Sequence, residues 1–216
     1  MRMNLEERWS QLWKELKGRG DGKALYAMLV HCYGERGREY HNLSHLEHCF
    51  EELDEVRSLA LNPSMLEFKL WLHDVFYTIG PKIPGLEGDE EASAEAAYNI
   101  LIDGGMGYHA ASDAYTGILC TLHNEEHSPS TTDDRLLVDI DLAILGQRQE
   151  RFDEYERQIR QEYDWVPEGI FQKRRAEILT GMYQRPHLYY TEHFQKKYED
   201  QTRKNLARSI KRLQSS

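Results

Sequence analysis

Apolar side chains recur at every third or fourth position along almost the whole chain, which is the spacing of one face of an α-helix. The first such face is formed by Leu5, Trp9, Leu12, Trp13 and Leu16. Further helices are predicted over residues 23–33, 44–56, 63–76, 90–103, 110–123, 133–145, 149–163, 168–183 and 191–213. Alternation of polar and apolar residues stays short throughout, so strands are not expected. The pattern predicts one all-α domain over residues 1–216, a helical bundle of about nine helices.

Local signals mark where several of these helices begin and end. Ser44 and Glu47 have the S-x-x-E spacing of a capping box, which predicts a helix start at Ser44. Asn62 followed by Pro63 fits a cap residue and a proline in the first helical turn. The segment TIGPKIPGLEG is rich in glycine and proline and is expected to form a loop.

The charge balance narrows the classes of function. The chain has 216 residues, with 37 Asp and Glu against 27 Lys and Arg, and a formal net charge of -10 at pH 7. An acidic surface repels a phosphate backbone, so we expect no binding of polymeric nucleic acid, although a local basic pocket can still hold one small phosphate. No apolar run reaches the roughly 18 residues of a spanning helix, and the N-terminus MRMNLEERWSQLW is charged, so neither a membrane span nor a secretory signal is expected.

The cysteines point to a reducing compartment. Cys32, Cys49 and Cys120 are an odd number and lack CxxC spacing. We expect them to be small buried thiols and not a disulfide or zinc framework. The expected location is therefore the cytoplasm.

Histidines and acidic residues gather at positions that suit a metal site. His45 lies in the histidine-rich segment HNLSHLEH near the start of the third predicted helix, and His73 and Asp74 adjoin near the end of the fourth. Asp139 and Asp141 lie within the apolar run LLVDIDLAILG, where a buried carboxylate needs a partner or a metal ion. Three helices of one bundle can bring two imidazoles and two carboxylates together. Such a mixed nitrogen and oxygen set suits a divalent ion of Mn, Fe, Co, Ni, Zn or Mg.

The order H…HD…D resembles the signature of the HD superfamily of metal-dependent phosphohydrolases. The segments YHNLSHLEH, LHDVFY, DEEASAEAA, TLH, DIDLAILG, IRQEY and RKNLA are similar to successive motifs of a bacterial branch described only as predicted HD-superfamily phosphohydrolases. The resemblance covers roughly residues 38–210 and implies the all-helical HD fold. It implies a metal held by His45, His73, Asp74 and a distal aspartate, for which Asp141 aligns better than Asp139.

The segment YHNLSH also resembles the Y-H-N-x-x-H segment of cyclic-nucleotide phosphodiesterases, which are distant members of the superfamily. In those enzymes the second His binds metal and the first donates a proton to the leaving group, which implies that His41 is the general acid. They also carry a His three residues after their His-Asp pair, where this chain has Tyr77. The difference favours one metal ion over two. It argues against cyclic-nucleotide hydrolysis and against the di-iron oxygenases of the superfamily.

Other residues acquire expected roles from their places in these motifs. Glu91 belongs to an E-x-S segment and is expected to activate water, with stabilisation of its own first helical turn as the alternative. Contacts with the phosphate or the leaving group are expected from His123 and from three cations, for which ordinary surface charge is the alternative. The three cations are Lys82, Arg185 and Arg203.

The sequence thus predicts a hydrolase for a phosphate ester or anhydride of a small metabolite, with a nucleotide as the first choice. Water activated by the metal would attack phosphorus. The alternative is a regulatory module that keeps the fold, the metal and nucleotide binding but turns over nothing. Four intact ligands favour the enzyme, because a binding role would not require all of them.

Overall fold

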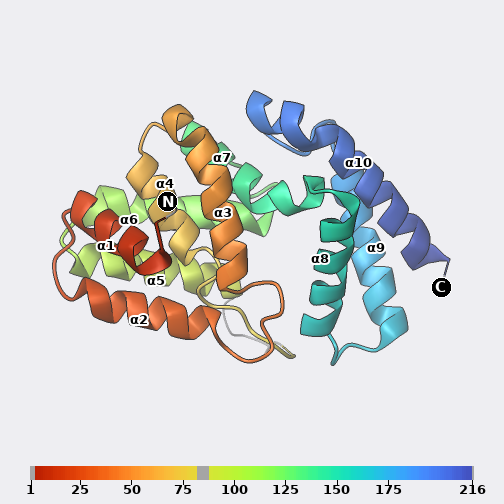
Figure 1. The fold of residues 1–216 in the computed structure, drawn as a ribbon, viewed down its shortest axis with the longest axis horizontal. Helices are drawn as coiled ribbons and strands as arrows, with labels where there is room; N and C mark the ends of the chain where they lie inside the picture. The colour runs from red at the N-terminus through yellow and green to blue at the C-terminus, as the bar shows by residue number, and fades with distance from the viewer. Residues whose placement is uncertain (1–2, 82–87, 216) are drawn as a thin grey trace.

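The computed structural model describes residues 3–81 and 88–215, which form ten α-helices, three short 3-10 helices and no strand (Figure 1). The α-helices are α1 (Leu5–Glu15), α2 (Gly22–Tyr33), α3 (Leu43–Val56), α4 (Pro63–Leu72), α5 (Asp89–Asp103), α6 (Gly107–Leu119), α7 (Thr132–Asp141), α8 (Gln149–Glu162), α9 (Glu168–Gln184) and α10 (Glu192–Gln214). The 3-10 helices are η1 (Arg57–Leu59), η2 (Cys120–Leu122) and η3 (Leu142–Gly146). The predicted all-α class is confirmed, and the predicted count of about nine helices is close.

The start of α3 differs from the sequence prediction. The cap residue is Asn42, whose side-chain oxygen accepts a hydrogen bond from the backbone N–H of Ser44 at 2.9 Å. The helix therefore begins at Leu43, and the predicted capping box of Ser44 and Glu47 is wrong. Asparagine and serine are both good cap residues, and the sequence spacing does not distinguish them.

Helix α4 begins as predicted but ends early. Asn62 caps it and Pro63 stands in its first turn. The helix ends at Leu72 instead of continuing to residue 76, and His73 is its C-cap residue. The His-Asp pair consequently lies at the end of a helix and not on its side.

Helix α4 also lies at the centre of the bundle, because it contacts α1, α3, α5, α6 and α7 and is buried from Met65 onward. Two of its buried residues are charged. Glu67 accepts a hydrogen bond from Nε of Arg8 at 3.0 Å, and Nζ of Lys69 lies 2.9 Å from Oδ1 of Asp134. Because each charge has a partner, the helix can be buried on all sides without leaving an unpaired charge inside.

Helices α8, α9 and α10 lie together on the side of the molecule that carries the C-terminus (Figure 1). Helix α10 packs against α9 and against η3, which continues α7. Asp139 in α7 fixes the start of α10, since its carboxylate accepts hydrogen bonds from the backbone N–H groups of Tyr190 at 2.7 Å and Thr191 at 2.8 Å. The C-terminal helices are thereby attached to the helix that carries Asp141.

The three cysteines Cys32, Cys49 and Cys120 are buried and free, as the sequence suggested. Across residues 3–81 and 88–215, no helix combines the length and apolar character required to cross a lipid bilayer.

Candidate metal centre

Three helix ends bring four metal-binding side chains to one point. His45 lies in the first turn of α3, His73 caps the end of α4, and Asp74 follows it. Asp141 is the last residue of α7. One ligand atom of each residue lies within 4.8 Å of those of the other three. The four residues predicted as ligands therefore meet, and this cluster could hold a metal ion.

Ring nitrogens and carboxylate oxygens face one another across the cluster. Nε2 of His45 lies 3.1 Å from Nε2 of His73 and 3.4 Å from both Oδ2 of Asp74 and Oδ1 of Asp141. Nε2 of His73 lies 3.1 Å from Oδ2 of Asp74 and 3.5 Å from Oδ1 of Asp141. The imidazole side chains are fully buried, whereas the carboxylate side chains are 15% and 16% exposed. Solvent therefore reaches the cluster from the carboxylate side.

A backbone hydrogen bond turns one ring nitrogen of His73 toward the cluster. Nδ1 of His73 lies 2.9 Å from the carbonyl oxygen of Leu70, so this nitrogen carries the hydrogen and donates it. The lone pair of Nε2 then points at His45 and at two carboxylates. A ring lone pair and two carboxylates that face one another need a cation between them, either protons or a metal ion. Two imidazole nitrogens and two carboxylate oxygens fit a divalent transition metal, and a second ring nitrogen held by a backbone carbonyl is usual for a metal-binding histidine.

The pKa shifts have the same origin. Burial alone would lower the pKa of His73, but Asp74 and Asp141 outweigh burial and raise it well above its usual value. Burial would raise the pKa of Asp74, yet His73 and His45 hold it well below its usual range. Burial would also raise the pKa of Asp141, but neighbouring histidines hold it well below its usual range. The hydrogen bond with His123 lowers it most. The cluster stabilises positive charge at its centre, and a metal ion that displaces the protons meets the same attraction.

The two aspartates of the DID segment point to different places. Asp141 faces His45 and His73, whereas Asp139 is fully buried and accepts hydrogen bonds from Tyr190 and Thr191. Residues two apart on an α-helix are about 200° apart around its axis, so both could not face the same cluster. The geometry thus selects Asp141, the residue favoured by the sequence motif, and gives Asp139 a structural part.

Cys49 offers a second combination of ligands that sequence analysis missed. It lies one turn after His45 on α3, and its Sγ is 3.6 Å from Nε2 of His45. His45, Cys49 and His73 also bring one ligand atom each within 4.8 Å of the others. A sulfur ligand would favour a softer ion such as zinc.

A buried glutamate holds His41 beside the cluster. Oε2 of Glu162 lies 2.7 Å from Nδ1 of His41, and Oε1 accepts hydrogen bonds from the backbone N–H groups of Tyr40 at 2.8 Å and His41 at 2.9 Å. Burial would raise the pKa of Glu162, but these hydrogen bonds leave it lowered, so the carboxylate is ionised. Nδ1 of His41 therefore donates to Glu162. The ring centre of His41 is 6.0 Å from that of His45.

Sequence analysis did not single out Glu162. The residue ends α8 inside the segment IRQEY, among many acidic residues of an exposed helix. Its side chain is buried because it shares a face with Ile159, three residues earlier, which is also buried. The spacing from Ile159 was the signal in the sequence that Glu162 is buried, and it is a weak one.

The other predicted site residues lie at increasing distance from the cluster. Nε2 of His123 is 3.1 Å from Oδ2 of Asp141, so His123 borders the cluster. Nη2 of Arg185 donates to the carbonyl oxygen of His123 at 2.6 Å and lies behind it. Arg203 donates to the carbonyl oxygen of Arg185 at 2.7 Å and pairs with Glu199. Its guanidinium supports the segment between α9 and α10.

Glu91 lies in the first turn of α5, where its Oε2 is buried without a hydrogen-bond partner among the described residues. Nearby, Ser93 accepts a hydrogen bond from the backbone N–H of Phe76 at 3.1 Å, which ties α5 to the segment after Asp74. Within the described chain, Glu91 forms no hydrogen bond or ion pair with the four ligands. Lys82 lies outside the described residues.

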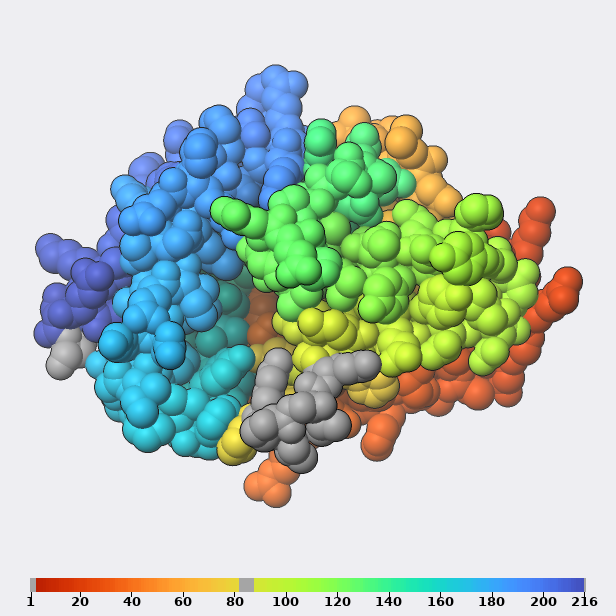
Figure 2. All heavy atoms as spheres, turned by 180° about the vertical axis from the view of Figure 1, so that it is seen from behind, coloured from red at the N-terminus to blue at the C-terminus, as the bar shows by residue number. Residues whose placement is uncertain are grey.

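The surface is hollowed between α9 and the segment after α6 (Figure 2). Atoms deep in this hollow have the orange of α3 and the yellow of the residues after α4, the segments that supply three of the four ligands (Figure 2). The exposed edges of the two carboxylates agree with an approach from this side.

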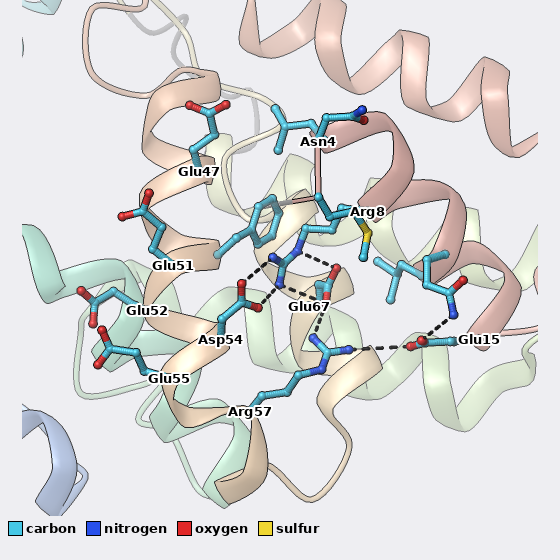
Figure 3. A pocket seen from close by; sticks show the side chains of 15 residues that line it. Asn4, Arg8, Glu15, Glu47, Glu51, Glu52, Asp54, Glu55, Arg57 and Glu67 are labelled. Atoms are coloured by element: carbon cyan, nitrogen blue, oxygen red, sulfur yellow. Dashed lines mark hydrogen bonds and ion pairs between the residues drawn. The ribbon is translucent and has the colours of Figure 1, made fainter. Parts of the chain in front are cut away.

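A separate hollow of about 1110 Å³ lies between α1 and α3 and is bordered by many carboxylates (Figure 3). Its charges are largely paired inside the fold. Arg8 contacts both Asp54 and Glu67, and Arg57 contacts both Glu67 and Glu15 (Figure 3). None of the four clustered ligands lines this hollow, so we interpret it as an ion-pair network that joins α1, α3 and α4.

No protein-family model, curated protein or solved structure matches the chain.

Proposed function

We propose that the protein is a metal-dependent phosphohydrolase acting on a small phosphorylated metabolite, with one divalent ion bound by His45, His73, Asp74 and Asp141. The observation that carries the proposal is a ligand cluster with a separate imidazole beside it. The four ligand atoms lie within 4.8 Å of one another, and the ring centre of His41 is 6.0 Å from that of His45. A purely structural metal site does not need a further histidine held on a buried glutamate.

A divalent ion in this cluster would polarise a phosphoryl oxygen and make a bound water more acidic. The side chains supply the remaining chemistry. Nδ1 of His41 is engaged by Glu162, so the proton that His41 gives comes from Nε2. It passes to the leaving oxygen as the bond from phosphorus to that oxygen breaks. Glu162 stabilises the imidazolium before the transfer and keeps the hydrogen on Nδ1 afterwards.

Binding an anionic phosphate to a chain of net charge -10 requires local positive charge. The ion offsets the two carboxylates of the cluster, and protonated His41 adds charge next to it. His123 borders Asp141, with Arg185 directly behind. We assign these two residues to the binding of the phosphate, and we assign activation of water to Glu91.

The test combines metal content with turnover. The protein is stripped with a chelator and loaded with Mn, Fe, Co, Ni, Zn or Mg, and bound metal and phosphate release from phosphorylated metabolites are then measured. We expect one ion per chain and phosphate release that depends on it. His73→Ala and Asp74→Ala should lose both. His31→Ala removes an exposed histidine of α2 and should lose neither.

The outcomes separate the alternatives. Full metal occupancy in His73→Ala and Asp74→Ala would contradict the site. Stoichiometric metal that is lost in these variants, without phosphate release from any metabolite, would contradict the enzyme. That result would leave the regulatory module that binds metal and nucleotide.

A further inference from the structure

A row of aromatic side chains leads from His41 to the surface. The ring of Tyr77 stacks on His41 with centroids 4.1 Å apart and planes 25° apart. The Tyr77 hydroxyl lies 3.5 Å from the Tyr163 hydroxyl. Tyr163 in turn stacks on Trp165, with centroids 6.3 Å and planes 30° apart. The row joins the segment after α4 to the turn after α8, whose cyan atoms border the hollow in Figure 2.

The outer end of the row is open to solvent. Tyr163 is 36% exposed and Trp165 is 43% exposed. The other three tryptophans of the chain, Trp9, Trp13 and Trp71, are at most 7% exposed. An exposed tryptophan that stacks on Tyr163, at the outer end of a row that begins at the proposed proton donor, is a surface that another flat ring can cover.

We propose that Tyr77, Tyr163 and Trp165 form a binding surface for a planar aromatic ring in the leaving group of the substrate. This inference rests on the proposed function and names its substrate class. The substrate is a phosphate ester of an alcohol that carries a flat ring, as a nucleoside does.

The position of His41 decides which end of the substrate meets this surface. Glu162 occupies Nδ1 of His41, so Nε2 must reach the leaving oxygen. The phosphoryl group lies on the side of the metal ligands, and the body of the leaving alcohol lies on the side of His41. Tyr77 covers one face of the His41 ring, so the alcohol extends past Tyr77 toward Tyr163 and Trp165.

Arginine side chains support this surface from behind. Arg160 donates hydrogen bonds to the backbone carbonyl groups of Tyr163 and Val166, which fixes the turn after α8. The guanidinium of Arg38 lies 5.8 Å from the ring centre of Tyr77 and donates to the carbonyl oxygen of Asp74 at 2.7 Å. Aromatic side chains held in place lose little conformational entropy when a ring stacks on them.

The experiment compares kcat/KM for adenosine 5′-monophosphate and ribose 5-phosphate. The two esters share the phosphate and a primary alkoxide leaving group, and they differ in the base. Stacking of one base corresponds to about a 5- to 150-fold preference for the nucleotide. Trp165→Ala and Tyr163→Leu should reduce this ratio strongly, and Trp165→Phe should retain most of it. Tyr108→Ala removes a 64% exposed aromatic side chain from α6 and should leave the ratio unchanged.

Equal kcat/KM for the two esters, or an unchanged ratio in Trp165→Ala, would overturn the ring-binding surface while the phosphohydrolase stands. If neither ester is hydrolysed, equilibrium dialysis with the same compounds tests the surface separately. Tighter retention of the nucleotide that is lost in Trp165→Ala and kept in Trp165→Phe supports it, and equal retention overturns it. A change of association state in Trp165→Ala with an unchanged ratio would identify a contact between copies and also overturn it.

Discussion

Nδ1 of His41 lies 2.7 Å from Oε2 of Glu162, although the two residues are 121 positions apart in the chain. The contact joins the loop before α3 to the end of α8, so it forms only when the C-terminal helices have packed onto the bundle. His45 lies four residues after His41, and its Nε2 faces the ligand cluster. Two histidines of one short segment therefore have different partners, and their removal should have different effects.

We expect His45→Ala to lower metal occupancy and His41→Ala to leave it intact. Loss of a general acid typically lowers the rate by about 10²- to 10⁴-fold. This defect should appear with an alkoxide ester such as ribose 5-phosphate, because an alkoxide needs a proton to leave. It should be small with p-nitrophenyl phosphate, because p-nitrophenolate leaves unprotonated. Elemental analysis and the two rates check the prediction.

Metal content and the two rates also show which outcome would contradict these roles. Metal loss from His41→Ala equal to that of His45→Ala, or equal slowing of both esters, would make His41 a ligand or a positioning residue.

Glu162→Gln should impair the proton transfer without disturbing the metal. The amide oxygen can still accept hydrogen bonds from the backbone of Tyr40 and His41, but the amide nitrogen replaces the acceptor that faces Nδ1. The imidazolium loses its charge partner, and the neutral ring is driven to the wrong tautomer. We expect the rate with the alkoxide ester to fall by about 10²-fold or more, with metal content unchanged.

Glu162→Ala serves as the comparison, because it also removes the acceptor for two buried backbone N–H groups. It should lower the free energy of unfolding by about 1–3 kcal/mol more than Glu162→Gln does, as measured by denaturant titration. An alkoxide to nitrophenyl rate ratio that is the same in Glu162→Gln and the wild type would rule out the assigned role of Glu162.

The helices and the candidate ligands could be predicted because their signals can be read directly along the sequence. The spacing of apolar residues defines the helices, and glycine and proline mark several of their ends. The H…HD…D order identifies His45, His73 and Asp74. The contact between His41 and Glu162 and the row from Tyr77 to Trp165 depend on how α8 packs against the bundle. No local pattern reports that packing. His45 and Cys49 are neighbours by helical spacing, but the approach of His73 to both became visible only when the helix ends had been placed.

Asp139 and Asp141 provide a matched pair of variants. Asp141→Asn should lose the metal, and the rise in melting temperature on addition of Mn²⁺ should disappear, because a ligand that binds only the folded state stabilises it. Asp139→Asn should keep that rise. Its amide nitrogen would face the N–H donors of Tyr190 or Thr191, which should cost about 1–3 kcal/mol of stability and lower the melting temperature by roughly 2–12 °C. Metal loss from Asp139→Asn with metal retained in Asp141→Asn would reverse the assignment.

Glu52 should make the attachment of α10 to α3 sensitive to acid. Burial alone would raise the pKa of Glu52, but hydrogen bonds with His48, Lys197 and Tyr198 lower it from 4.5 to about 2. A carboxyl group whose pKa falls on folding stabilises the folded state above its unfolded pKa. This contribution should be present in full above about pH 5 and disappear as the pH falls toward 2. The shift sets an upper limit of about 3 kcal/mol, and solvent around the partly exposed Lys197 reduces the expected value to roughly 1–2 kcal/mol.

The measurement is the free energy of unfolding of the wild type and of Glu52→Gln between pH 7 and pH 2.5, with chelator present so that metal release does not contribute. The difference between the two proteins should be largest above pH 5 and should shrink by more than half by pH 2.5, because the unfolded chain takes up a proton on Glu52 below pH 4.5 while the folded protein still holds the carboxylate ionised. Glu47→Gln removes an exposed carboxylate from the same helix and controls for the change in net charge. If the difference between wild type and Glu52→Gln stays constant over this range, the stabilisation does not come from the ionised carboxylate. Packing would then hold α3 and α10 together.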